Sequence, residues 1–106
     1  MSVNRFRGEV ALKLDGVAHV MRLNLAALAG LEADLGADSL VALVERFEGG
    51  RFKAADVIAL LLAGLEGGGA PMTREALMAA SIEGGPLGAA RAAAELLRVT
   101  FSTEAA

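Results

Sequence analysis

The sequence predicts a mostly α-helical fold of the α+β class: an N-terminal β-hairpin followed by about five short helices packed around a central hydrophobic helix. Residues 53–66 form the most apolar run of the chain, and on a helix their apolar side chains would face every direction. Such a helix is buried in a core or a membrane, and a bilayer requires about 20 apolar residues, more than this run provides. Alanine and leucine, which favour helices, are abundant, and strand-like alternation is clear only near the N-terminus.

Length and composition predict one domain over residues 1–106, divided into a hairpin (3–24), a helical bundle (25–101) and a frayed tail (102–106). A chain of this size can bury a core without disulfides, and the sequence contains no cysteine. The N-terminal residues lack the apolar segment of a secretory signal, so we expect a cytoplasmic protein. The net charge of −3 and the scattered basic residues argue against a nucleic-acid surface, and the short apolar run argues against a membrane span.

Alternating apolar residues predict the two strands of the hairpin. The alternation covers Phe6, Val10, Leu12 and Leu14, then Val17, His19, Met21 and Leu23. Asp15-Gly16 separates the two runs and predicts a two-residue type I′ turn, which requires positive φ at both positions. This turn fixes the register, with Leu14 opposite Val17, and it places the apolar side chains on one face, against the helices. The opposite face would pair Glu9 with Arg22.

The first helix is expected over residues 25–35. Asn24 is placed to cap it, because an Asn side chain can accept a hydrogen bond from the first turn. Leu23 and Leu28 stand on either side of the cap with the spacing of a hydrophobic staple. Gly36 is predicted to end the helix.

The second helix is predicted from an apolar stripe with i, i+3, i+4, i+7 spacing. The stripe consists of Leu40, Leu43, Val44 and Phe47. Asp38 is expected to cap this helix, and Gly49-Gly50 is expected to end it.

The central helix is expected over residues 53–66. Lys53 occupies the position where a Ser or Asp cap would be expected, so the start of the helix is weakly marked. Its end is strongly marked by glycines 67–69 and by Pro71. The helix contains small residues that would let the alanine-lined last helix approach closely: Ala59, Ala63 and Gly64.

Two further helices complete the predicted bundle. Thr73 is expected to cap the fourth helix, with Met72 stapled to Leu77, and this helix would run to about Ser81. Pro86 is expected in the first turn of the last helix, where its missing N–H has no cost. The last helix carries a seam of apolar residues spaced by three and four: Leu87, Ala90, Ala94, Leu97 and Phe101.

No motif in the sequence predicts catalysis, a metal site or a cofactor. His19 is the only histidine, and its parity places it on the apolar face of the hairpin, without the nucleophile and acidic partner of a general base. The glycine runs match neither a Walker loop nor a dinucleotide fingerprint, and the carboxylates lie on polar helix faces. We therefore expect a non-catalytic binding or structural protein, with a structural or partly exposed His19.

The residues most suited to binding a partner belong to the apolar seam of the last helix and to two phenylalanines near the central helix. They are Leu87, Ala90, Ala94, Leu97, Phe101, Phe47 and Phe52. Two interpretations remain for these side chains. They pack in the core, or they form a groove for an amphipathic helix of a partner or of a second copy.

Several segments also match a family pattern over nearly the whole chain, from about Asn4 to Phe101. They are RGEVALKLDG in the hairpin, LNLAALAGLEADLGADSLVALVERFEGGRF after it, LLAGLEGGG at the end of the central helix, and IEGG. In these segments the chain resembles the small tail protein of alphaproteobacterial gene transfer agents. That family is grouped with phage tail assembly chaperones and is also described as a tail tube protein.

The resemblance implies a role in building a phage-like tail in the bacterial cytoplasm. A chaperone of this class would bind the long helical tape measure protein while tail tube subunits polymerise around it, and would then leave. The partners implied are the tape measure protein and the tail tube protein, with a homo-oligomer as a further option. The alternative is a structural tube component that stays in the particle, and an enzyme is the least favoured interpretation.

Overall fold

The computed structural model describes residues 3–35 and 40–101, apart from the side chain of Arg5. Its elements are a 3-10 helix η1 (Arg5–Arg7), strands β1 (Glu9–Leu14) and β2 (Val17–Arg22), and helices α1 (Leu25–Leu35), α2 (Leu40–Glu48), α3 (Ala54–Gly67), α4 (Arg74–Ala79) and α5 (Gly85–Phe101). The predicted class and order, a hairpin followed by five helices, are confirmed for these residues. The predictions for Gly36, Asp38 and the tail 102–106 lie outside the described residues.

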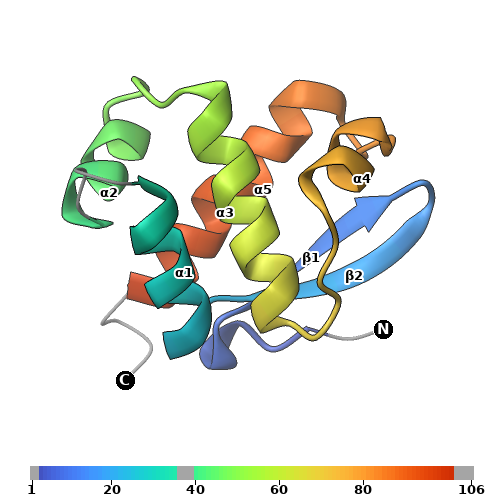
Figure 1. Ribbon diagram of the computed structural model, residues 1–106, viewed down its shortest axis with the longest axis horizontal. Coiled ribbons are helices and arrows are strands. Elements are labelled where there is room, and N and C mark those ends of the chain that lie inside the picture. Colours follow the sequence, from blue (N-terminus) through green and yellow to red (C-terminus); the bar gives the residue numbers. More distant parts are fainter. Residues whose placement is uncertain (1–2, 36–39, 102–106) are drawn as a thin grey trace.

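Helix α3 is the centre of the fold, as its apolar sequence predicts. It packs against β2, α1, α5 and α4, and it runs through the middle of the molecule with α5 crossing behind it (Figure 1). Its fully covered side chains include Leu60 and Leu65. The predicted close approach of the last helix occurs at Gly64, where a Cβ atom would lie 2.6 Å from Cδ2 of Leu96.

The hairpin has the predicted turn and register. Asp15 and Gly16 have φ angles of 51° and 79°, and Leu14 lies opposite Val17. The β1 residues of the predicted apolar face are buried, whereas on β2 only Met21 is fully covered, His19 is half-buried and Val17 is exposed. The apolar face therefore extends over β1 and the inner end of β2, while the turn projects beyond the helices.

Phe6 does not belong to the first strand, so this part of the hairpin prediction is wrong. It lies in η1 and is 82% exposed. The cause is local: the Asn4 side chain accepts a hydrogen bond from the Phe6 N–H at 3.0 Å. The Asn4 carbonyl accepts hydrogen bonds from the N–H groups of Arg7 and Glu9, and the resulting turn delays the strand until Glu9. The Glu9 carboxylate in turn accepts the Asn4 N–H at 2.8 Å, although Glu9 stands opposite Arg22 as predicted.

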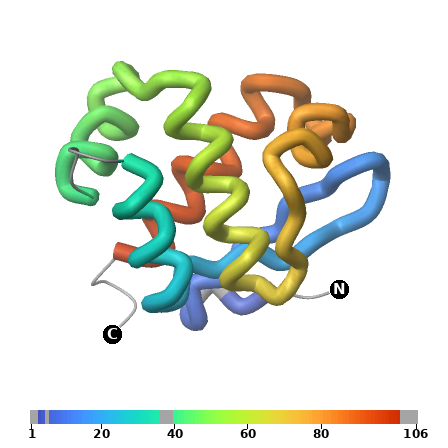
Figure 2. The backbone as a smooth tube through the Cα atoms, in the orientation of Figure 1, coloured from blue at the N-terminus to red at the C-terminus, as the bar shows by residue number. Residues whose placement is uncertain are grey.

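The outer edge of β1 is covered near the hairpin turn by the segment 81–83, which the chain brings back between α4 and α5 (Figure 2). The Asp15 N–H donates to the Ser81 carbonyl at 2.8 Å, and the Glu83 N–H donates to the Lys13 carbonyl at 3.1 Å. These bonds use backbone groups through which an edge strand could otherwise pair with another chain.

The outer edge of β2 is covered by the end of α3. A Cβ atom on Gly67 would lie 1.9 Å from the carbonyl oxygen of Arg22, and one on Gly68 would lie 1.9 Å from that of Val20. The glycine hydrogens thus point at strand carbonyls, in the manner of Cα–H···O contacts. Only glycine permits this approach, so the glycine run both ends α3 and seats it on the sheet.

The chain leaves α3 through a Schellman motif. Gly69 has a φ of 92°, its N–H donates to the Glu66 carbonyl at 3.1 Å, and the Ala70 N–H donates to the Leu65 carbonyl at 2.8 Å. This pattern satisfies the last carbonyls of the helix. The helix ends at Gly67, within the predicted glycine run and one residue later than expected.

Two predicted helix caps are present. The Asn24 side chain accepts the Ala27 N–H at 2.9 Å, and the Thr73 side chain accepts the Ala76 N–H at 3.0 Å. Helix α4 ends at Ala79 rather than near Ser81, because Ala80 is extended and Ser81 is bonded to the hairpin turn.

The start of α3 is more firmly fixed than Lys53 alone indicates. The Asp56 side chain accepts the backbone N–H of Lys53 at 2.8 Å. This is the reciprocal half of a capping box, supplied by the third helical residue while the cap position itself holds a lysine.

Replacing Gly68 by alanine should destabilise the protein by about 2–3 kcal/mol, because the new methyl group would collide with the backbone of Val20. Gly68 has an ordinary helical φ of −85°, so backbone strain does not contribute. The control is Gly30→Ala, where a Cβ meets no atom within 4 Å and helix propensity should add up to about 1 kcal/mol. Urea denaturation measures both changes. Equal stability of the two variants would contradict the proposed contact.

Candidate partner-binding surface

The predicted seam of α5 is not the face of the helix that packs on the core. The core-facing residues of the helix are Ala89, Ala93, Leu96 and Leu97. Of the predicted residues, Leu97 is buried, Ala90 is half-buried, and Leu87, Ala94 and Phe101 are exposed. Core packing is therefore wrong for Leu87 and Ala94. Because α5 has apolar residues on more than one side, their spacing alone could not select the face that meets α3.

Phe47 and Phe52 form a separate cluster. Their rings are stacked, with centroids 4.6 Å apart and planes inclined by 8°, and both side chains are partly buried against the core. The cluster joins α2 to the link before α3. For these two rings the structure therefore favours core packing over a partner-binding groove.

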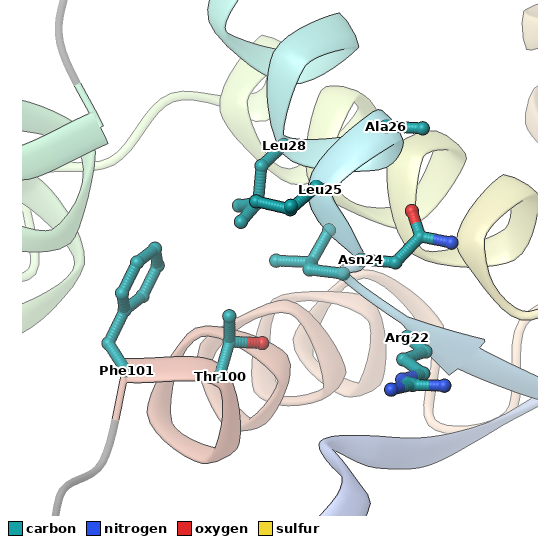
Figure 3. Close-up of a pocket in the computed structure, with 8 residues that line it drawn as sticks. Arg22, Asn24, Leu25, Ala26, Leu28, Thr100 and Phe101 are labelled. Atoms are coloured by element: carbon teal, nitrogen blue, oxygen red, sulfur yellow. The ribbon is translucent and has the colours of Figure 1, made fainter.

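Phe101 instead lies in an open groove between the start of α1 and the end of α5, of about 650 Å³. We call it the α1–α5 groove; its lining consists of Arg22, Leu23, Asn24, Leu25, Ala26, Leu28, Thr100 and Phe101. Figure 3 shows the side chains of Leu25 and Leu28 pointing toward the ring of Phe101. Leu25 is 85% exposed and Phe101 is 43% exposed, so the groove offers apolar side chains to solvent. Leu87 lies roughly 20 Å away along the axis of α5.

The polar groups around the groove are largely engaged within the protein. Asn24 caps α1 through its bond from Ala27, and the Thr100 hydroxyl donates to the Leu96 carbonyl at 2.6 Å. Arg22 supplies an exposed positive charge at the rim. The groove thus suits apolar side chains of a partner, with a favourable position for an acidic group beside Arg22.

Leu25 is the groove residue that sequence reasoning missed. It follows the cap and lies off the stripe Leu28, Leu31, Leu35 that packs α1. An apolar residue at the first helical position outside the buried stripe is a weak signal, because single exposed leucines are common. Leu25 becomes part of a groove only because the end of α5 lies beside it in the fold.

Asp56 is the buried charged residue of the described chain, at 5% exposure. Arg46 of α2 donates two hydrogen bonds to its carboxylate, each of 3.0 Å, and the Lys53 N–H donates a third. Burial alone would raise the pKa of Asp56, but these hydrogen bonds and the charges of Arg46 and Lys53 outweigh it, so the pKa lies below its ordinary value. Because Arg46 lies on α2 and Asp56 on α3, this ion pair ties the two helices together.

Residues 3–35 and 40–101 contain neither a metal-binding cluster nor a membrane-spanning helix. The His, Asp and Glu side chains there do not gather in groups of three that could hold a metal ion. No helix in this part of the chain has both the length and the apolar character that crossing a membrane demands. His19 is half-buried on β2 opposite Leu12.

Comparison with known families gives one match. The family model described as "Phage tail tube protein, GTA-gp10" matches residues 7–103. No curated protein and no solved structure matches the chain.

Replacing Asp56 by asparagine should cost about 2–3 kcal/mol at pH 7, because the Arg46 guanidinium would then face a neutral amide in place of a buried carboxylate. The lowered folded pKa means that the unfolded chain takes up the proton first as the pH falls. The stabilisation by Asp56 should therefore be complete above about pH 5 and decline toward pH 3. Urea denaturation at pH 7 and at pH 3 should show that the difference in unfolding free energy between wild type and Asp56→Asn is smaller at pH 3. Glu66→Gln, on an exposed residue of α3, is the control and should change the stability at pH 7 by less than about 0.5 kcal/mol. A difference between wild type and Asp56→Asn that is independent of pH would contradict this role.

Proposed function

Because the chain belongs to the GTA-gp10 phage tail tube protein family, we propose that this tail protein acts as a non-catalytic assembly chaperone that binds the tape measure protein. The family resemblance implies that the tape measure protein is long and helical. A chaperone for such a protein needs a surface that binds helices. The observation that supports this role is the α1–α5 groove, where Leu25 and Phe101 expose apolar side chains.

The groove fits the recognition of an amphipathic helix. In that mode, apolar anchors at i, i+3, i+4 and i+7 enter an apolar groove, and polar groups at the rim set the orientation. Leu25, Leu28 and Phe101 would receive the anchors, and Arg22 would attract an acidic residue of the partner.

The second candidate is a structural tube component, which the description of the family as a tail tube protein favours. A tube built by strand pairing would require accessible strand edges. In this protein, backbone bonds to the segment 81–83 cover β1 near the turn, and the end of α3 covers β2. Association through strands is thus hindered at these positions, which favours association through helices.

The remaining parts of the proposal follow from the tail role. The protein would act in the bacterial cytoplasm, where tails are assembled, and would meet the tail tube protein as the tube grows around the tape measure. Neither catalysis nor a cofactor is required. Self-association through the same apolar groove would compete with partner binding.

Charged substitutions in the groove should abolish binding of the tape measure protein without unfolding the chaperone. We expect Leu25→Glu and Phe101→Glu each to weaken co-purification with tape measure fragments at least about tenfold, because each places a charge among apolar anchors. Met78→Glu, at an apolar residue of α4 whose exposure (64%) lies between those of Leu25 and Phe101, should leave binding unchanged. Full binding by both groove variants would exclude the groove, and absence of any complex with wild type would exclude the chaperone role.

The amount of this protein in finished particles separates the two candidate functions. A chaperone that leaves should be absent or present in traces in purified particles. Quantitative mass spectrometry should therefore find far fewer copies than of the tube subunit. Stoichiometric copies would contradict the chaperone and support the structural component.

A further inference from the structure

Helix α2 covers one side of the core as an amphipathic helix. Leu43 is completely buried, and Leu40, Val44 and Phe47 pack against the core, while Val41 is 68% exposed. The helix lies at the periphery of the molecule, away from the hairpin (Figure 1). It thus occupies an apolar surface in the way a bound peptide helix would.

The attachment of α2 is made chiefly by side chains. In the described residues, the closely packed pairs of elements are those of α3 with β2, α1, α5 and α4, of α5 with the two strands, and of β1 with β2 and η1. The contacts that hold helix α2 include the two-pronged hydrogen bond from Arg46 to Asp56, the stack of Phe47 on Phe52 and the packing of its apolar stripe on the core. Parts of a fold open locally with different free energies, and α2 lies at the edge of this one (Figure 1).

Helix α2 also ends in its own Schellman motif, after which the chain can change direction. Gly50 has a φ of 70°, and the Arg51 N–H donates to the Arg46 carbonyl at 2.8 Å. The carbonyl groups at the end of α2 are therefore satisfied by its own continuation. Displacement of α2 would leave them paired.

We propose that the surface beneath α2 is a second helix-binding site, which α2 occupies in the closed protein and which a partner helix of the same chemistry can take. The partner is an amphipathic helix with apolar residues at i, i+3, i+4 and i+7. It also carries an arginine or lysine three residues after the apolar residue that replaces Leu43. Asp56 imposes this basic residue, because its buried carboxylate would otherwise lose its countercharge.

This site differs from the α1–α5 groove and does not depend on which tail protein binds there. Occupation by α2 makes the site available only in the fraction of molecules in which α2 is displaced. The apparent affinity for a partner helix is reduced by that fraction. Weakening the tie between Arg46 and Asp56 should therefore strengthen binding of a competing helix that carries its own arginine.

The test uses Arg46→Ala in the full chain and a fluorescent peptide with the sequence of residues 40–50 as the probe. Hydrogen exchange should become at least about tenfold faster in α2 than in wild type, with α3 and α5 unchanged. The peptide should bind the variant at least about tenfold more tightly than wild type, and a peptide with alanine in place of its arginine should not. Arg51→Ala, at an exposed arginine just after α2, is the control and should behave as wild type.

Two results would overturn the proposal. One is exchange in α2 at the rate of α3 in Arg46→Ala, which would show that α2 opens only with the whole fold. The other is failure of the peptide to bind a variant whose α2 amides are exposed. If Arg46→Ala loses protection everywhere, the same two measurements on Arg46→Lys, which keeps the charge, decide between these outcomes. Because the probe comes from this chain, loss of tape measure binding would not affect the result.

Discussion

The contact between the end of α3 and the outer edge of β2 positions the rest of the structure. Gly67 and Gly68 bring the helix backbone against the carbonyls of Arg22 and Val20, closer than any side chain would allow. One turn earlier in α3, the side chains of Leu96 and Met21 pack closely against Gly64. A helix that is apolar on every side must be covered on every side, and these glycines set the distance at which the hairpin and α5 can cover it.

Elements fixed by short-range chemistry could be predicted from the sequence, and those fixed by tertiary contacts could not. The start of α1 and the hairpin register followed from Asn24 and from the turn Asp15-Gly16. Phe6 departed because the Asn4 side chain competes with the strand for backbone N–H groups. The face of α5 was not predictable, because its apolar residues cover more than one side, and the contact with Gly64 selects Leu96.

The same distinction holds for the candidate surface. Phe101 could be singled out from its spacing, but its neighbours in the groove come from the opposite part of the sequence. Leu25 and Leu28 lie near Phe101 only because the fold places the start of α1 beside the end of α5. Arg46 and Asp56 were missed for a related reason: each lies on a helix where a charged residue reads as solvent-exposed, and the burial arises when α2 folds back on α3.

The ion pair between Arg46 and Asp56 contributes more to position than to stability. A buried pair recovers little beyond its desolvation cost, and the apolar stripe of α2 could pack in more than one rotation or register. A planar guanidinium that binds both carboxylate oxygens, each at 3.0 Å, accepts one geometry. The stack of Phe47 on Phe52 then orients the end of the helix. The ion pair and the stack therefore specify the position of α2 and add only modestly to the stabilisation from its apolar stripe, a combination that suits both a defined closed state and exchange for another helix.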